Sequence, residues 1–128
     1  MSAGSFPFAL TGDVTVNPKT DYLARIGAAI HDKDALLMEV AAKLRFPPYF
    51  VRPNWDAFHD WMEDLSWIGN ARILLLHEAA PHLSRKELKI YLEILRDATD
   101  SLRESGRALI VAFPAQTRAL LDAWGGVK

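Results

Sequence analysis

Two short and nearly continuous apolar runs mark the chain, over residues 71–76 and 107–113. Turn residues bound both runs, and Pro114 closes the second. A strand that is buried on both faces has this pattern, which favours a parallel sheet. A third strand is predicted over residues 22–26, just before a glycine.

Apolar residues recur at helical spacing in three other segments. Each segment follows a residue that is suited to cap a helix N-terminus, namely Asp32, Asn54 and Ser84. Ser84 and Glu87 also form the S-x-x-E pattern of a capping box, and Gly106 supplies a left-handed cap after the third segment. We therefore predict three helices, whose inward positions are Leu36, Leu37, Val40, Ala41 and Leu44, then Trp55, Phe58, Met62 and Leu65, then Leu88, Tyr91, Leu92, Leu95 and Leu102.

Proline and other turn-forming residues mark the ends of helices and the loops in the remaining segments. The first helix must end near Phe46, because the two prolines that follow lack amide donors and push the preceding residue into an extended conformation. A proline-rich loop over residues 47–53 follows, and residues 115–124 predict a short terminal helix. The first 20 residues predict an irregular arm, in which Val14 and Val16 alternate as in a short edge strand.

This order of elements predicts a small α/β domain. Strand, helix, helix, strand, helix and strand succeed one another, which is typical of a three-stranded parallel sheet flanked by helices in a three-layer-like arrangement. The helical crossover between the last two strands is expected to be right-handed. We assign residues 1–20 to an N-terminal arm and residues 21–128 to a single domain, since one core is normal at this length.

Composition excludes several classes of protein. The chain has 15 Lys and Arg against 16 Asp and Glu, which excludes a strongly basic nucleic-acid coat and a solvated acidic tail. It has no cysteine, so it has neither disulfides nor thiolate metal sites. Its first residues lack the features of a secretory signal, and no run approaches the roughly 18 apolar residues of a membrane span. We expect a cytoplasmic protein without a membrane contact.

The net charge of −1 conceals a local acidic segment. Residues 54–70 contain four carboxylates and neither Lys nor Arg. Asp56, Asp60 and Glu63 stand at i, i+4 and i+7 of the predicted helix, so they share one stripe beside its apolar face, and His59 lies on the same side. Such a stripe is typical either of a solvated surface or of a face that binds a cationic partner.

The loop and helix that carry this stripe read FPPYFVRPNWDAFHDWM over residues 46–62. This stretch resembles the signature of the barstar family of intracellular ribonuclease inhibitors. That signature begins with a Pro, two aromatic residues and a loop that contains Gly. It continues with Asn, an aromatic residue or Leu, Asp, Ala, Leu or Phe, any residue, and Asp. A looser resemblance in element order extends from Tyr22 to Phe113. The resemblance implies three parallel strands flanked by helices.

The resemblance also implies a function. Barstar-like proteins use this helix and loop to plug the active site of a secreted, cationic ribonuclease of the barnase type. That active site binds phosphate through basic side chains, and an inhibitor carboxylate takes the place of the phosphate through charge-assisted hydrogen bonds. The implied partner of this chain is a basic ribonuclease, bound one to one by a monomer. Neither direct nucleic-acid binding nor a cofactor is implied.

The motif implies a role for several residues. Asp60 falls on the phosphate-mimicking Asp, and Asp56 falls on the recognition Asp one turn earlier. Tyr49 falls on the loop aromatic that packs against the nuclease, and Asn54 falls on the Asn between loop and helix. His59 stands where the best-known member of the family has Trp.

Two further residues extend the expected partner-binding set. Glu63 continues the acidic stripe, and Asp97 on the long helix matches a further acidic contact, although counting back from the glycine cap leads to Ser101 instead. The loop departs from the family pattern, because residues 51–53 replace its Gly with one extra residue. Within them, Arg52 adds a cation beside a surface that would meet a cationic enzyme.

Structural roles compete with these assignments. Asn54 has a sufficient role as a helix cap, and Tyr49 would equally well pack under the proline loop. Trp55, Phe58 and Trp61 are more typical of a helix core than of a platform for bases, because the face beside them repels phosphate. His77 and His82 are predicted to be structural or to face solvent.

Two other classes of function are alternatives to inhibition. An enzyme would assemble Asp56, His59 and Asp60 into an acid/base cluster, or Asp56 and Asp60 into a hard-metal site. The chain shows neither a nucleophile motif nor a phosphate-binding glycine loop, so we expect no catalysis and no metal. A non-inhibitory interaction module would keep the fold and bind another basic protein through the acidic stripe.

Overall fold

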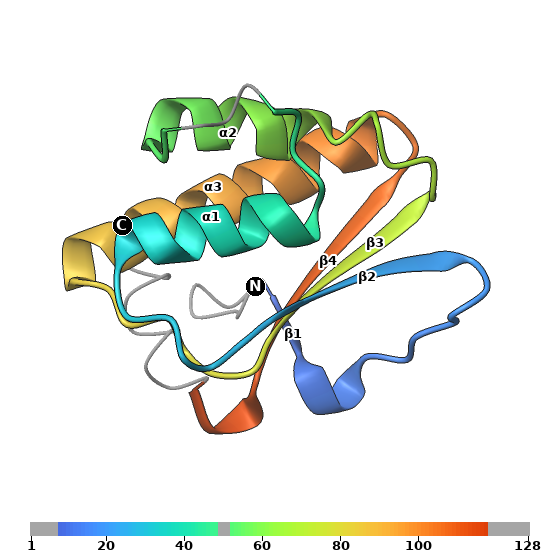
Figure 1. Cartoon of the computed structure of the whole chain (residues 1–128). Coiled ribbons are helices and arrows are strands. Elements are labelled where there is room, and N and C mark those ends of the chain that lie inside the picture. The colour runs from blue at the N-terminus through green and yellow to red at the C-terminus, as the bar shows by residue number, and fades with distance from the viewer. Residues whose placement is uncertain (1–7, 49–51, 118–128) are drawn as a thin grey trace, which may run out of the picture.

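A computed structural model describes residues 8–48 and 52–117, in which three α-helices lie on one face of a parallel sheet (Figure 1). The prediction of an α/β domain with a helix-flanked parallel sheet is confirmed. The elements follow the chain as β1 (Ala9–Leu10), η1 (Thr11–Asp13), β2 (Asp21–Ile26), α1 (Lys33–Lys43), α2 (Trp55–Asp64), β3 (Arg72–His77), α3 (Arg85–Glu104), β4 (Ala108–Phe113) and η2 (Ala115–Thr117).

The sheet has four strands rather than the predicted three. Its order is β1-β4-β3-β2, and every neighbouring pair is parallel. The additional strand, β1, pairs Ala9 with Ala112 and Leu10 with Phe113. Two residues carry too little periodicity to reveal a strand, and β1 depends instead on the free edge that β4 offers. The division of the chain into an arm and a domain stays a prediction.

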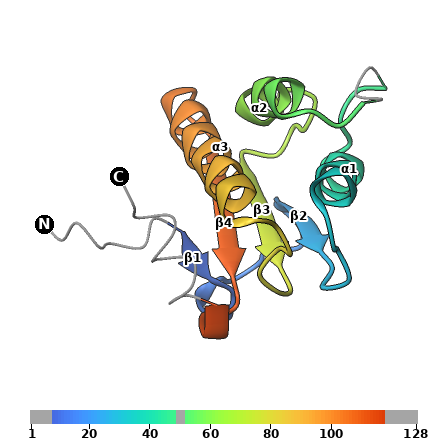
Figure 2. The same cartoon turned by 90° about the vertical axis from the view of Figure 1, so that its left-hand side faces the viewer.

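The two faces of the sheet are covered differently (Figure 2). Buried side chains from all three α-helices join one large apolar core with the strand residues that face them. On the opposite face, Leu74, Leu76 and Ala112 form a smaller cluster, against which Val14 and Val16 pack. The two valines, predicted to belong to an edge strand, therefore lie outside the strands and cover the second face of the sheet.

The predicted helix caps are present. Asp32 and Asn54 each accept a hydrogen bond from the amide three residues later, at 2.8 Å. Ser84 and Glu87 form both halves of the capping box, at 3.1 and 3.2 Å, and Gly106 has a φ of 81°. Local sequence chemistry therefore determines where all three α-helices begin.

Two helices are not seen over the full ranges that the sequence predicts. One ends earlier than predicted, and the predicted range of the other extends past the described residues. The first helix ends at Lys43, before the expected Phe46, because the chain turns through Arg45 at a φ of 55°. Of the terminal helix expected over residues 115–124, the structure has η2, and the residues after Thr117 lie outside the described part. No helix within the described ranges is long and apolar enough to cross a membrane.

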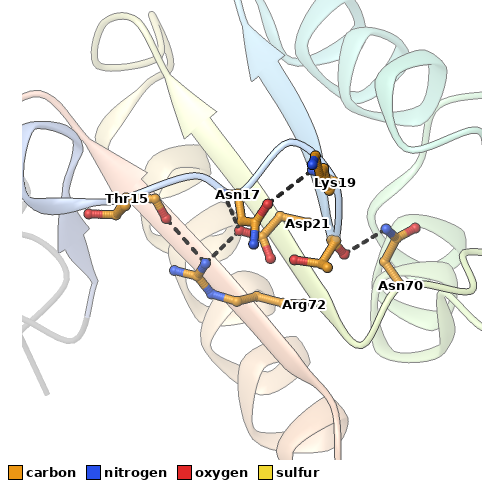
Figure 3. Close-up of polar contacts among 7 residues, drawn as sticks. Thr15, Asn17, Lys19, Asp21, Asn70 and Arg72 are labelled. Atoms are coloured by element: carbon orange, nitrogen blue, oxygen red, sulfur yellow. Dashed lines mark hydrogen bonds and ion pairs between the residues drawn. The ribbon is translucent and has the colours of Figure 1, made fainter.

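A polar network attaches the segment before β2 to the sheet (Figure 3). The side chain of Asp21, only 4% exposed, accepts hydrogen bonds from Arg72 at 2.6 Å and from the amide of Asn17 at 2.8 Å. Arg72 also donates to the carbonyl of Thr15 at 3.1 Å, and Asn70 donates to the carbonyl of Thr20 at 2.8 Å. These contacts hold residues 15–21 against the amino ends of β2 and β3.

A series of ring contacts runs through the core from the helices to the sheet. Phe46 contacts Phe58 of α2, which stacks on Tyr91 of α3 with ring centroids 6.0 Å apart. Tyr91 meets His77 of β3 edge to face, and His77 stacks on Phe113 of β4 at 4.1 Å. These contacts set the height of α2 above the sheet.

His77 is the buried polar residue of this series, with 1% of its surface exposed. Its Nδ1 lies 3.0 Å from the carbonyl of Ala112 and must therefore donate, so Nε2 accepts from the Tyr91 hydroxyl at 2.7 Å. Burial lowers the pKa of His77 to about 4, against the opposing effect of the Ala112 hydrogen bond. Burial also raises the pKa of Tyr91. The structural role predicted for His77 is confirmed, and its exposure to solvent is excluded.

Candidate functional site

The acidic stripe lies on α2, which packs along α3 (Figures 1 and 2). Phe58 and Met62 are fully buried, as the helical spacing predicted. Trp55 and Trp61 are partly buried and pack against the same core, so these aromatic residues form the inner side of α2 rather than a platform for bases. The acidic positions are consequently turned to the outer side of the helix.

The start of α2 is held by its cap. Asn54 Oδ1 accepts from the Ala57 amide at 2.8 Å, and Asn54 Nδ2 donates to the carbonyl of Arg52 at 3.1 Å. One side chain therefore joins the first turn of α2 to the loop before it. The expected cap is confirmed, whereas a contact between Asn54 and a partner stays a prediction.

Replacing Asn54 with Ala removes the acceptor for the Ala57 amide, so we expect the free energy of unfolding to fall by about 1 kcal/mol. Asn54→Asp keeps an acceptor oxygen in this position and is expected to retain most of the stability. Urea denaturation followed by circular dichroism measures both changes. Equal losses in the two variants would contradict the capping role.

The end of α2 is held by Arg107, which lies in the turn between α3 and β4. Leu65 follows the helix with a φ of 48°, and Arg107 donates to three carbonyls at and just after the end of α2, those of Asp64 at 3.0 Å, Leu65 at 2.6 Å and Ile68 at 3.1 Å. A positive side chain at this position also complements the negative end of the helix dipole. With both ends fixed, the outer face of α2 is a rigid surface.

Asp56 and Asp60 lie exposed on that face, one helical turn apart. No described Lys or Arg forms an ion pair with either carboxylate. Asp56 is in the first turn, where the helix dipole stabilises a negative charge, but Asp60 is not. Asp60 is thus a charge without an intramolecular partner among the described residues, available to a cation from outside.

His59 links the stripe to α3. Its Nε2 lies 3.1 Å from Glu63 Oε2 and 3.2 Å from Asp97 Oδ2. The three side chains are 38%, 39% and 52% exposed, in the order His59, Glu63 and Asp97. The fold therefore brings Asp97 to the stripe and places it beside His59, whereas a contact between Asp97 and a partner stays a prediction.

Ser101, the alternative to Asp97, also meets α2. Its hydroxyl donates to the carbonyl of Glu63 at 3.2 Å, one turn further along α3 than the contact between Asp97 and His59. The second contact lies four residues later than the first on both α2 and α3, so the two helices run in the same direction. Asp97 adds a charged side chain to the outer surface, whereas Ser101 is used in packing the two helices together.

The predicted residues differ in how far the structure describes them. Tyr49 lies outside the described residues. Among the described side chains, the group of three potential metal ligands whose atoms converge is His59, Glu63 and Asp97, all within 4.8 Å of one another, and it includes neither Asp56 nor Asp60. The i, i+4 spacing of His59 and Glu63 could be read from the sequence, but the approach of Asp97 from α3 could not.

Comparison with known proteins relates most of the chain to one protein family. A family model described as Barstar (barnase inhibitor) matches residues 23–114. The match runs from within β2 to the residue after β4, so it includes all three α-helices and leaves out β1. Comparisons with curated proteins and with solved structures found no match.

Proposed function

The chain belongs to the barstar family, and we propose that it inhibits a basic ribonuclease of the barnase type by covering the active site of that enzyme with α2 and the preceding loop. One observation carries the proposal. Asp56 and Asp60 stand exposed on one face of a helix that is fixed at both ends, and no described Lys or Arg pairs with either carboxylate.

The proposed mechanism is occlusion and needs no chemical step. A ribonuclease active site gathers basic side chains to hold phosphate, and the Asp60 carboxylate would occupy the phosphate position through charge-assisted hydrogen bonds. Asp56 would contact a second basic group one turn away. Because α2 is already ordered, little conformational freedom is lost on binding. Complementary charge also speeds the encounter of the two proteins.

Arg52 supports a second candidate, an interaction module that binds a basic protein other than a ribonuclease. This residue is exposed three positions before the first residue of α2, where its positive charge would oppose a cationic enzyme. If the partner is a ribonuclease, we expect it to carry an acidic or neutral group opposite Arg52. If the partner is not a ribonuclease, the same acidic stripe would bind it without inhibiting RNA cleavage.

A ribonuclease assay distinguishes these candidates. The chain is used to capture partners from its native host, and RNA cleavage by the captured protein and by a purified barnase-type ribonuclease is measured while the chain is titrated. We expect activity to disappear at a one-to-one ratio. An Asp56→Asn/Asp60→Asn double variant should inhibit neither protein. Undiminished cleavage in the presence of saturating chain would contradict inhibition, and capture of a basic protein without ribonuclease activity would favour the interaction module.

A further inference from the structure

A single imidazole nitrogen lies between two carboxylates at the junction of α2 and α3. His59 Nε2 is 3.1 Å from Glu63 Oε2 and 3.2 Å from Asp97 Oδ2, and all three ligand atoms lie within 4.8 Å of one another. We infer that these three side chains bind a divalent transition-metal ion of the zinc class. The inference concerns the free chain and does not depend on the inhibition proposed above.

Two of the three ligand-to-ligand distances are close to those around a tetrahedral ion, and the third, between the Glu63 and Asp97 oxygens, is at most 4.8 Å. Zinc binds imidazole nitrogen and carboxylate oxygen at about 2.0–2.2 Å, so two ligand atoms of a tetrahedral site stand about 3.4 Å apart. The two distances from His59 Nε2 are only slightly shorter than this edge, and small side-chain rotations would open them. Three protein ligands leave the fourth position for water.

A hydrogen bond from His59 Nε2 can serve only one of the two carboxylates fully, whereas a metal ion would bind all three side chains. A neutral imidazole carries its hydrogen on one of its two nitrogens, so Nε2 offers at most one hydrogen, yet carboxylates of Glu63 and Asp97 both approach it. A bound cation would accept the lone pairs of all three ligand atoms. Because one ligand is nitrogen, the site favours zinc over magnesium or calcium, which prefer oxygen ligands.

The setting of the cluster allows an ion to enter and be held. The side chains of His59, Glu63 and Asp97 are 38%, 39% and 52% exposed, so an ion can reach them from solvent. Their backbones belong to two helices that pack directly together, with Ser101 bonded to the carbonyl of Glu63. The site is therefore open to solvent but built on rigid elements, which limits the ordering that binding requires.

Calorimetric titration with zinc chloride tests the inference on chelator-treated, full-length protein. We expect saturable binding of one ion per chain and no comparable binding of magnesium. His59→Gln and Asp97→Asn are each expected to weaken zinc binding at least about tenfold, since even loss of a residue behind a metal ligand has an effect of this size. Circular dichroism checks that both variants remain folded.

His82→Ala is the matched control. Its ring lies 5.2 Å from that of His31, so this pair is the place in the described part of the chain where two histidines meet. The chain has four histidines and no cysteine, and His77 is buried with both ring nitrogens engaged. We expect His82→Ala to bind zinc like the parent. Absence of zinc binding by the parent, binding that survives His59→Gln and Asp97→Asn, or loss of binding with His82→Ala would each overturn the inference.

Discussion

Replacing Asp60 with Ala is expected to weaken the complex with a barnase-type ribonuclease by at least about 30-fold, equivalent to about 2 kcal/mol, the scale of an interface hot spot. The Asp60 carboxylate is exposed, central on α2 and without a described Lys or Arg partner, so its bonds in the complex would be made to the enzyme. Losing it would also leave basic groups of the enzyme buried and unpaired, which adds to the cost. Asp56→Ala is expected to weaken the complex next most.

Surface plasmon resonance or titration of ribonuclease activity measures the change in affinity. Asp60→Asn keeps the size of the side chain and removes its charge, so it is expected to resemble Asp60→Ala. Glu78→Ala makes the same change in net charge at an exposed position just after β3, away from α2, and serves as the control. A ribonuclease that binds Asp60→Ala as tightly as the parent would refute the phosphate-mimicking role.

Acid is expected to destabilise the fold through His77. The pKa of this group is about 4 in the folded chain, against an ordinary histidine value of 6.5, so the unfolded chain takes up the proton first as pH falls. The contribution of neutral His77 to the free energy of unfolding is complete above pH 6.5 and is lost progressively between pH 6.5 and 4. At about 1.4 kcal/mol for each unit of pKa difference, the free energy of unfolding would fall by up to about 3 kcal/mol.

Urea denaturation at a series of pH values tests this expectation. His77→Gln removes the titrating group, so its free energy of unfolding is expected to change less than that of the parent between pH 6.5 and 5. His82→Ala removes an exposed histidine and is expected to keep the pH dependence of the parent. A parent and a His77→Gln variant with parallel pH profiles would show that His77 does not cause the loss.

Local chemistry made most of the fold predictable. The caps at Asp32, Asn54 and Ser84 act within three residues, so the sequence contains everything that each cap needs. The spacing of Phe58 and Met62 likewise identified the buried side of α2, which implied the outward position of Asp56 and Asp60. The strands buried on both faces were recognisable from their nearly continuous apolar runs and the turn residues that bound them.

Long-range pairing made other features unpredictable. β1 has two residues and exists through its register with Ala112 and Phe113 of β4. The buried, hydrogen-bonded position of His77 could not be predicted from the sequence either, because its partners, Tyr91 and Ala112, come from α3 and β4. A histidine at the end of an apolar run has the same local signature whether it is buried or exposed.

The sequence by itself determined that α2 begins after Asn54, that it presents an acidic outer face, and that the chain resembles the barstar family. These properties follow from cap chemistry, helical period and a continuous motif, all of them local in the chain. Only the tertiary structure decided that Asp97, rather than another residue of α3, meets His59. The physical reason is that such a contact depends on the direction and rotation of two packed helices, which the periodicity of neither helix specifies.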